Sequence, residues 1–482
     1  MYDILIIGSG LSSSAFLRGF GNKNKKIGLI SPSNFKMQNQ DLPTNLYKYL
    51  YKNLPPRFIK NNINGYANYF LKNKIKVENN ISIFGDLSHG GVSKYWGGSC
   101  EFPNEKQINF LNNKNKKKLI NSYVEIFKEN NFYGDLNFSN NKFKKKQKFI
   151  NKGLNQLFRN LVLKKKSKIV EFFNNINAKN SKTGNLYLPL NLKKLPKNVK
   201  KLNFFVTEIR KKNNFYSVLC ENDKGIGTIE IFTKKLVLGS GTVSTTKLIC
   251  KMLKIRKSIK INHNPMLFGI FILKKKIKIE KFAPSRLAAK VFDNKSKLIS
   301  LTNFRTSNLI IKSKIFDNFT IMKNFFSRAC YNILEKNLLF YNLYLDSNFG
   351  NLNMQLQNNN EIKIFYKTQK ITKIKKKLYS EAKIIYDFLK SKNLILPFKL
   401  KFLPPWGNDN HYTGTIPING SHNKLSLKQN CELKGHKNLF IIDGSSIPNT
   451  SVKFPTALII SNAFRIGKDF KWKFLELKFI VN

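Results

Sequence analysis

The chain begins with a short apolar segment that runs directly into a glycine turn, and this junction constrains the fold more than any other feature of the 482 residues. Residues Tyr2–Ile7 read as a strand buried on both faces, which is typical of a parallel sheet. A helical pattern follows the turn and continues to Phe20. A strand, a glycine turn and a helix in this order predict a dinucleotide-binding turn, although strand–helix turns without a ligand share the order.

The residues of this turn have separate roles in the prediction. Gly8 permits the tight turn, and Gly10 lets the backbone approach a pyrophosphate at the N-terminus of the helix. Ser13 stands where a third glycine is usual and is small enough for close packing. The second predicted strand, 26–30, ends at Ser31 without the carboxylate that usually binds a ribose, so we expect one serine hydrogen bond there instead. The predicted contacts are Gly8, Gly10, Leu11, Ser12, Ser13 and Ser31.

A second glycine-rich segment, 85–99, holds five glycines. This density indicates a backbone that a ligand approaches closely, and the alternative interpretation is a surface loop. Trp96 argues against a plain surface loop, because the chain has only three tryptophans. Two nucleotide-facing loops with an aromatic residue suit a long cofactor such as FAD. The predicted contacts are Gly90, Gly91, Ser93, Tyr95, Trp96, Gly97 and Gly98.

Two later segments repeat the pattern of a buried strand followed by glycine. Strands are predicted at 201–209, 215–220, 226–232 and 235–238, and a helix is predicted from about Ser244. A last strand, 438–442, precedes an apolar helix at 457–466. Pro455 suits the first turn of that helix, whose free N–H groups can face a group that becomes anionic. The predicted contacts are Val206, Gly239, Ser240, Gly241, Asp443, Gly444, Pro455 and Thr456.

Taken in order, the segments 2–20, 90–98, 206–248 and 404–468 resemble the glucose-methanol-choline (GMC) oxidoreductases, which are FAD enzymes that oxidise alcohols and sugars. The loop 90–96 is most similar to the pyranose-oxidase branch and its bacterial sugar-processing relatives. In pyranose oxidases a histidine before the tryptophan bonds covalently to the flavin. Tyr95 holds that position here, so the resemblance implies a non-covalent FAD. It also implies a small alcohol or sugar substrate, and it leaves the electron acceptor open.

The segment 411–415 has the family's spacing of a histidine, two residues, glycine and threonine, so His411 matches the active-site histidine. An imidazole with a pKa near 6.5 suits removal of the hydroxyl proton as hydride moves to flavin N5, although a single histidine is often structural. The family pairs this histidine with an Asn or a second His, where this chain has Phe454. Three alternatives remain open: slower oxidation, another partner such as Asn410 or Asn449, or a protein that no longer oxidises alcohols.

The predicted fold class is α/β, α+β overall, with a Rossmann-like FAD-binding domain and an inserted antiparallel substrate lobe. The FAD-binding domain is expected to be discontinuous, and the segments 36–79 and 111–199 are expected to be peripheral helices or loops. All strands predicted in the lobe are expected to share one sheet, backed by a helix at 378–389. The FAD-binding domain comprises 1–35, 80–110, 200–265 and 430–482, the lobe comprises 266–429, and its predicted strands are 266–279, 297–303, 338–345, 352–356 and 361–366.

The formal net charge of +59 has two interpretations. Only nine of the 86 basic residues are arginines, and Lys, Asn, Ile, Phe and Tyr, all abundant here, share A/T-rich codons. Because specific readers of DNA use arginine for bidentate base contacts, we expect no specific nucleic-acid partner and attribute the charge to composition. The alternative is a basic protein that binds an anionic partner.

The cysteines and the apolar stretches indicate in which cellular compartment the protein is expected. The five cysteines are widely separated, odd in number and without a C-x-x-C pair, which predicts a reduced, cytoplasmic chain. No apolar stretch reaches 18 residues, so no transmembrane helix is expected, and the start does not read as a signal peptide. No metal site is expected.

Overall fold

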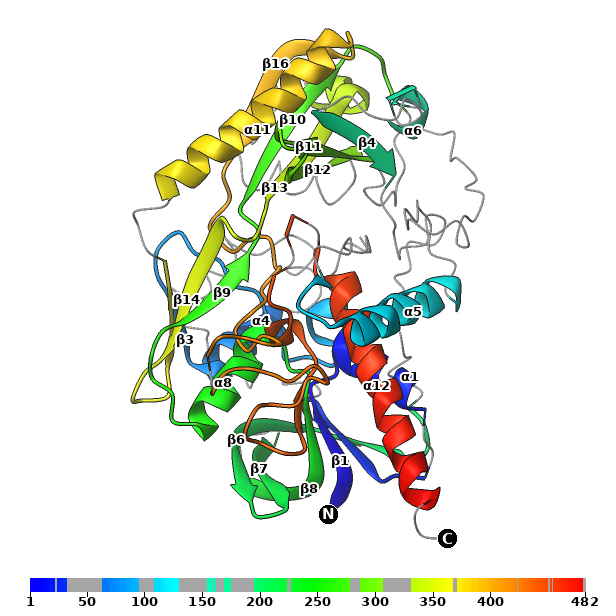
Figure 1. Cartoon of the computed structure of the whole chain (residues 1–482). Helices are drawn as coiled ribbons and strands as arrows, with labels where there is room; N and C mark the ends of the chain where they lie inside the picture. The colour runs from blue at the N-terminus through cyan, green and yellow to red at the C-terminus, as the bar shows by residue number, and fades with distance from the viewer. Residues whose placement is uncertain are drawn as a thin grey trace.

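The computed structural model describes residues 1–21, 24–32, 63–94, 108–129, 154–158, 160–161, 169–174, 195–222, 227–277, 287–306, 331–366, 371–422, 424–449, 451–452 and 454–479. These residues form a lower body around a mostly parallel sheet and an upper body around an antiparallel sheet, with a smaller sheet between them (Figure 1). The expected mixed α/β architecture, with a Rossmann-like parallel sheet and a separate antiparallel sheet, is confirmed.

The lower sheet has seven strands in the order β5-β2-β1-β8-β7-β6, and β17 also pairs with β8. Strand β1 lies at the centre, parallel to β2 and β8, which explains why Ile4, Leu5 and Ile6 are fully buried. The strands are β1 (Tyr2–Ile7), β2 (Ile27–Ile30), β5 (Val199–Leu202), β6 (Phe204–Lys212), β7 (Phe215–Asn222), β8 (Thr228–Leu238) and β17 (Leu439–Ile441).

Two predictions for this sheet are wrong. The segment 201–209 was expected as one strand, but it is divided between β5, which pairs with β2, and β6, which pairs with β7. The segments 226–232 and 235–238 were expected as two strands, but β8 is a single strand through Thr233 and Lys234. Its first half pairs with the antiparallel β7, and its second half pairs with the parallel β1. The change of partner within one strand explains why its pattern changes from exposed alternation to the continuous burial of Leu236, Val237 and Leu238.

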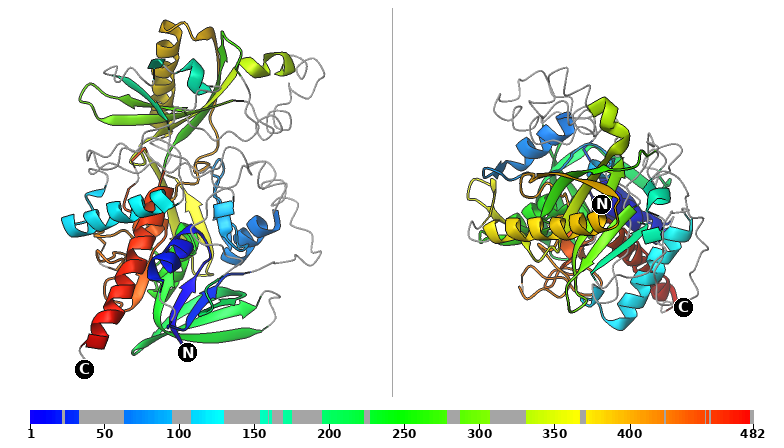
Figure 2. Two further views of the ribbon diagram at one scale, coloured as in Figure 1. Left: turned by 90° about the vertical axis from the view of Figure 1, so that its right-hand side faces the viewer. Right: turned by 90° about the horizontal axis from the view of Figure 1, so that it is seen from above.

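The first and last helices of the described chain cross closely beside this sheet. They are α1 (Leu11–Phe20) and α12 (Thr456–Phe479), and they run side by side in Figure 2. At the crossing, a Cβ on Gly19 would lie 2.2 Å from the carbonyl oxygen of Phe464, and a Cβ on Gly467 would lie 2.2 Å from that of Phe16. The two backbones therefore touch through a pair of glycines that no larger residue can replace without displacement.

Further helices complete the lower body. Helix α8 (Thr242–Met252) follows β8, and α5 (Asn113–Glu129) packs on α12. The fully buried Arg465 of α12 donates to Asn115 of α5 and to the carbonyl oxygen of Gln429, 2.7 and 3.0 Å away. The remaining elements here are α4 (Ile63–Asn73) and the short 3₁₀ turns Gly91–Lys94 and Gly444–Ser446.

The upper sheet is antiparallel, in the order β16-β10-β13-β12-β11-β4. Helix α11 (Ile371–Ser391) covers its outer face with Ile374, Leu378, Ile385 and Leu389, which recur at helical spacing. Buried Glu381 of α11 accepts a 2.9 Å hydrogen bond from Ser300 of β12. The strands are β4 (Val170–Asn174), β10 (Met266–Leu273), β11 (Leu287–Phe292), β12 (Leu298–Thr306), β13 (Leu338–Leu345) and β16 (Ile395–Phe402); the short helices are α6 (Leu154–Leu157) and a 3₁₀ turn at Glu335–Asn337.

The strands predicted at 352–356 and 361–366 form, but not in the upper sheet as expected. They are β14 (Gly350–Leu356) and β15 (Ile362–Phe365), which join β3 (Ile75–Val77) and β9 (Ile259–His263) in a four-stranded sheet ordered β3-β15-β14-β9. Leu352, Met354, Ile362 and Ile364 are buried in the core of the lower body. An alternating pattern fixes which face of a strand is buried but not which sheet the strand joins, so the sequence did not distinguish the two.

Within the described residues, no helix has both the length and the apolarity that a membrane crossing requires.

Candidate active site

A cavity of about 650 Å³ opens where the carboxyl ends of β1, β2 and β8 face the upper sheet. This volume lies within the range of roughly 300–1,000 Å³ that is usual for cofactor and ligand sites. Open parallel sheets bind ligands at this edge. The lining comes from both bodies, at residues 7–12, 30–32, 69–74, 84–88, 90–93, 204–207, 239–242, 303, 305, 344, 409–412, 443–444 and 454–456 among others.

The N-terminus of α1 faces the cavity with its first backbone N–H groups uncapped. Gly10 holds the N-cap position, and no side chain caps the helix. A Cβ on Gly10 would meet no heavy atom within 4 Å, and its φ of −73° suits any residue, so packing and backbone geometry do not explain this glycine. The open space above it fits a pyrophosphate on the helix N-terminus. By contrast, Gly8 has a φ of +98°, and a Cβ there would lie 2.4 Å from the carbonyl oxygen of Gly239.

The end of β2 meets the second glycine segment through serine hydroxyls. The hydroxyls of Ser9 and Ser31 lie 2.6 Å apart, and Ser9 accepts a 2.9 Å hydrogen bond from the N–H of Gly90. His89 Nδ1 lies 3.4 Å from the Ser31 hydroxyl. The two glycine segments, about 80 residues apart in the chain, therefore form one rim of the cavity.

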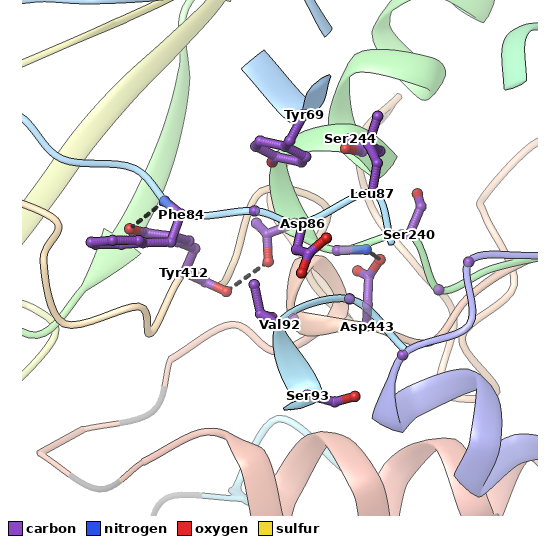
Figure 3. Close-up of a pocket in the computed structure, with 18 of the residues that line it drawn as sticks. Tyr69, Phe84, Asp86, Leu87, Val92, Ser93, Ser240, Ser244, Tyr412 and Asp443 are labelled. Atoms are coloured by element: carbon purple, nitrogen blue, oxygen red, sulfur yellow. Dashed lines mark hydrogen bonds between the residues drawn. The ribbon is translucent and has the colours of Figure 1, made fainter. Parts of the chain in front are cut away.

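Asp443 forms part of a second rim of the cavity and lies beside Ser240 in Figure 3. Its carboxylate accepts hydrogen bonds from the N–H of Gly241 at 2.9 Å, the hydroxyl of Thr245 and the N–H of Ser445 at 3.0 Å. Burial raises the pKa of Asp443, and these donors oppose the rise. The network ties the end of β17 to the start of α8 and fixes the loop 239–241 against the cavity.

At the other end of the cavity, a buried carboxylate positions two histidines. Asp409 Oδ1 lies 3.0 Å from His263 Nδ1, and Oδ2 accepts from the N–H groups of Asn264 and His411 at 2.8 and 3.2 Å. Burial alone would raise the pKa of Asp409, but the charge and hydrogen bond of His263, together with His411 and the Asn264 N–H, outweigh it and hold that pKa below its usual value. Asp409 is therefore an anion that fixes the backbone of the segment 409–415, which carries His411 and is called the strap below.

The imidazole of His411 lines the cavity and keeps about 15% of its surface exposed. Burial lowers the pKa of His411 to about 4, although nearby Asp409 acts in the opposite direction and His263 adds to the lowering. Its Nδ1 lies 3.7 Å from Asp409 Oδ2, which is too long for a hydrogen bond. At neutral pH the ring is thus uncharged and able to accept a proton.

Aromatic rings surround this histidine. The ring centroids of His411 and Phe454 lie 4.7 Å apart, and Tyr344 lies 5.7 Å from His411 and 5.0 Å from Phe454. Beside them Asn410, which has a φ of +63°, lines the cavity with an amide oxygen that is buried without a hydrogen-bond donor. Phe454 lines the cavity as an apolar wall beside His411.

The residues after His411 lock the strap to the lower body. The hydroxyl of Tyr412 lies 2.5 Å from the carbonyl oxygen of Gly407 and accepts from the N–H of Phe84 at 3.3 Å, as Figure 3 shows for Phe84. Thr415 bonds Thr246 of α8 at 2.7 Å. These contacts give the H-x-x-G-T segment a structural role in placing the histidine.

Most residues predicted as contacts do line one cavity, although their roles in binding stay predictions. Ser13 is the exception, because it is fully buried beneath the turn. Tyr95, Trp96, Gly97 and Gly98 lie outside the described residues. The lining includes Gly8, Gly10, Leu11, Ser12, Ser31, Gly90, Gly91, Ser93, Val206, Gly239, Ser240, Gly241, Asn410, His411, Asp443, Gly444, Phe454, Pro455 and Thr456.

Sequence reasoning missed Asp409, His263 and the cavity-lining residues of the upper sheet, which are Asn303, Arg305 and Tyr344. Asp409 had a local signal, since a carboxylate two residues before the histidine can reach its backbone. Arg305 had a compositional signal, since arginine is rare in this chain. His263, Asn303 and Tyr344 reach the site only through long-range pairing and had no local signal.

Comparison with known protein families finds no matching family model, and no curated protein matches the sequence. Solved structures do match. The crystal structure of pyridoxine 4-oxidase from Mesorbium loti aligns over 98% of this chain and 99% of its own, with a TM-score of 0.62 and 12% sequence identity. At that identity the likeness establishes the fold, so the chain has the mixed α/β fold of this oxidase over nearly its full length.

Proposed function

We propose that the protein is an FAD-dependent oxidoreductase that oxidises a CH–OH group of an alcohol or sugar derivative, with His411 as the general base. One observation carries this proposal: a single cavity joins the uncapped N-terminus of α1 to an uncharged histidine. The first feature suits a pyrophosphate, and the second suits removal of a hydroxyl proton.

The residues around the cavity fit FAD. The N–H groups after Gly10 would hold the pyrophosphate, and Ser31 would bond the ribose in place of the usual carboxylate. Val206 and the loop 239–241 would line the adenosine part, while Pro455 and Thr456 would line the flavin part. We further propose that the FAD is non-covalent, because the resemblance to pyranose oxidases places Tyr95 where those enzymes have the linking histidine.

FAD, when bound, supplies a hydride acceptor at N5 for the carbon of the alcohol. His411 accepts the hydroxyl proton, and its low pKa keeps it in the accepting form. Asp409 fixes the strap and keeps the histidine in place through its N–H. Phe454 and Tyr344 exclude water from the base, and Asn410 offers an unpaired amide oxygen to the substrate.

Two further observations bear on the proposal. The full-length likeness to an oxidase of the same fold agrees with redox chemistry. The described cysteines, Cys220, Cys250 and Cys431, are unpaired and buried, so none of them bridges the segments that line the cavity. Neither observation selects the electron acceptor.

An absorbance spectrum of the purified protein tests the proposal. We expect flavin bands that bleach when a panel of alcohols and sugars is added without oxygen. Acid precipitation should leave the yellow colour in the supernatant, whereas a yellow pellet would contradict non-covalent binding. A protein that neither carries nor takes up FAD would refute the proposed function.

A second candidate is a flavoprotein of the same fold that no longer oxidises alcohols. Phe454 favours it, because phenylalanine can neither exchange a proton nor hydrogen-bond a substrate oxygen. This candidate predicts flavin bands that no alcohol bleaches.

A further inference from the structure

We propose that the substrate carries an oxyanion, a carboxylate or a phosphate, in addition to the hydroxyl that is oxidised, and that Arg305 binds this anion. The inference rests on the proposed function, because it assigns the substrate class of the same cavity. The anion-binding residue comes from the upper sheet and lines the cavity that also holds His411.

Arg305 points into the cavity because of its place on β12. Side chains alternate along a strand, so Asn303 and Arg305 share the face that lines the cavity. Phe304, between them, is buried on the opposite face in the core under α11. Both Asn303 and Arg305 belong to a regular antiparallel pairing with β13, which holds the arginine on a rigid element.

No described residue neutralises or hydrogen-bonds Arg305. Its Nε is buried without a partner, and no described carboxylate forms an ion pair with its guanidinium group. The four other arginines that the structure describes all have partners: Arg18, Arg210 with Glu208, Arg256 with the carbonyl oxygen of Gln357, and the buried Arg465. A partly buried guanidinium without an anion lacks the compensation that charged groups normally have in proteins.

None of the four described carboxylates that line the cavity forms an ion pair with Arg305, although Oδ2 of Asp86 has no hydrogen-bond partner among the described residues. Each is held by a partner on its own side of the site: Asp86 by the Ser88 N–H, Glu221 by Lys72, Asp409 by His263, and Asp443 by the Gly241 N–H. The lysines that line the cavity belong to the lower body, on α4 and α8 or directly after α4. Of the described residues that the upper sheet contributes, Asn303, Arg305 and Tyr344, only the arginine is charged.

The position of Arg305 relative to His411 determines how far the anionic group of the ligand lies from its reacting hydroxyl. Tyr344, whose ring lies 5.7 Å from His411, pairs with Leu301 in the sheet. Arg305 lies four residues further along β12, a distance of about 14 Å between backbone positions at roughly 3.4 Å per residue. The arginine side chain spans part of that distance, so the anion lies several bonds from the reacting hydroxyl. The planar guanidinium suits a carboxylate or a phosphate through two parallel hydrogen bonds.

Titration of the FAD-loaded protein with small anions tests the inference. The probes are sodium benzoate and inorganic phosphate, with neutral benzamide as the control, and the readout is the shift of the flavin absorbance bands. The Arg305→Gln variant should bind the preferred anion at least roughly tenfold more weakly, because it loses a charged, bidentate contact. Arg305→Lys should recover part of the affinity. Arg256→Gln, which removes an exposed arginine elsewhere, should bind as the wild type does.

Preference for benzoate or for phosphate identifies the anion as a carboxylate or a phosphate. The inference is overturned if neither anion binds the wild-type protein, or if Arg305→Gln binds them as tightly. Calorimetric titration of the apoprotein with the same anions and variants gives the same comparison without flavin. A protein that does not take up FAD, but binds anions through Arg305, would refute the proposed function and leave only the anion site at Arg305 standing.

Discussion

The ring of Phe454 lies 4.7 Å from the ring of His411, where the resembling family has a polar residue. The contact is apolar, so it shields the imidazole that we propose as the base but offers a substrate oxygen no hydrogen bond. It also adds to the burial that lowers the pKa of His411. The apolar contact therefore favours the uncharged form of His411. It also means that no second polar side chain at position 454 can hydrogen-bond the substrate beside the proposed base.

Replacing the base tests its role directly. We expect His411→Ala to slow flavin reduction by an alcohol donor by roughly 10²- to 10⁴-fold, which is the usual contribution of a general base. FAD should stay bound, because the uncapped turn of α1 is unchanged. Stopped-flow absorbance measures the rate, and His436→Ala, outside the cavity, is the matched control. Reduction at the wild-type rate would remove His411 as the base.

A polar residue at position 454 should restore the missing partner. We expect Phe454→Asn to raise the rate of flavin reduction, because an amide beside His411 can hydrogen-bond the substrate oxygen. Phe454→Leu keeps the wall apolar and should give no increase. If both variants reduce the flavin equally fast, the change reflects space in the cavity and not hydrogen bonding.

The pH dependence follows from the low pKa of His411. The base works only when uncharged, so its activity is present above its folded pKa and is lost as the pH falls through that value. With a pKa of about 4, the rate of flavin reduction should stay level from neutral pH down to about pH 5 and fall below it. A midpoint near 6.5, the ordinary value for histidine, would contradict the burial of this ring.

Two neighbouring glycines should respond differently to substitution. Gly10→Asn should not lower the unfolding temperature of the apoprotein, because the position is open and asparagine suits an N-cap, but it should lower the affinity for FAD at least roughly tenfold. Gly8→Ala should lower the stability of the apoprotein by about 1–3 kcal/mol, because of its positive φ and its contact with Gly239. Thermal unfolding and FAD titration separate the two effects. Equal loss of stability in both variants would contradict a ligand-related role for Gly10.

The lysine excess should give only weak binding to duplex DNA at physiological salt, without sequence preference, and steeply weakened by added salt. Fluorescence anisotropy with two unrelated duplexes measures this. Nanomolar, sequence-specific binding at that salt would show that the charge of +59 serves a nucleic-acid partner.

The sequence predicted what local chemistry determines. The strand Tyr2–Ile7, the turn after it and α1 follow from a buried run, two glycines and a helical period, and each forms as expected. His411 was found through a five-residue spacing, and the structure places it in the same cavity as Gly10. Such features depend on residues that are adjacent in the sequence, so they can be predicted without knowing how the rest of the chain folds.

The rest depends on contacts between distant segments. The pairing of β14 with β9 and the parallel pairing of β15 with β3 were not predicted, because neither is visible in the alternation of either strand. For the same reason His263 was not assigned to Asp409, from which it is separated by 146 residues. Arg305 sits in an ordinary strand pattern, and only the tertiary structure shows that it lacks a partner.

The crossing of α1 and α12 at Gly19 and Gly467 makes the distance between the two helix N-termini a fixed length. One end of that length faces the open space at Gly10, and the other lines the cavity at Thr456. A larger residue at either glycine would push the helices apart and change the length without touching the cavity. A molecule that spans both ends would then bind less tightly, whereas a fragment such as ADP, which needs only the first end, would bind as before. The ratio of the affinity for the spanning molecule to the affinity for ADP would measure how strongly the helix crossing controls the distance between the two ends of the cavity.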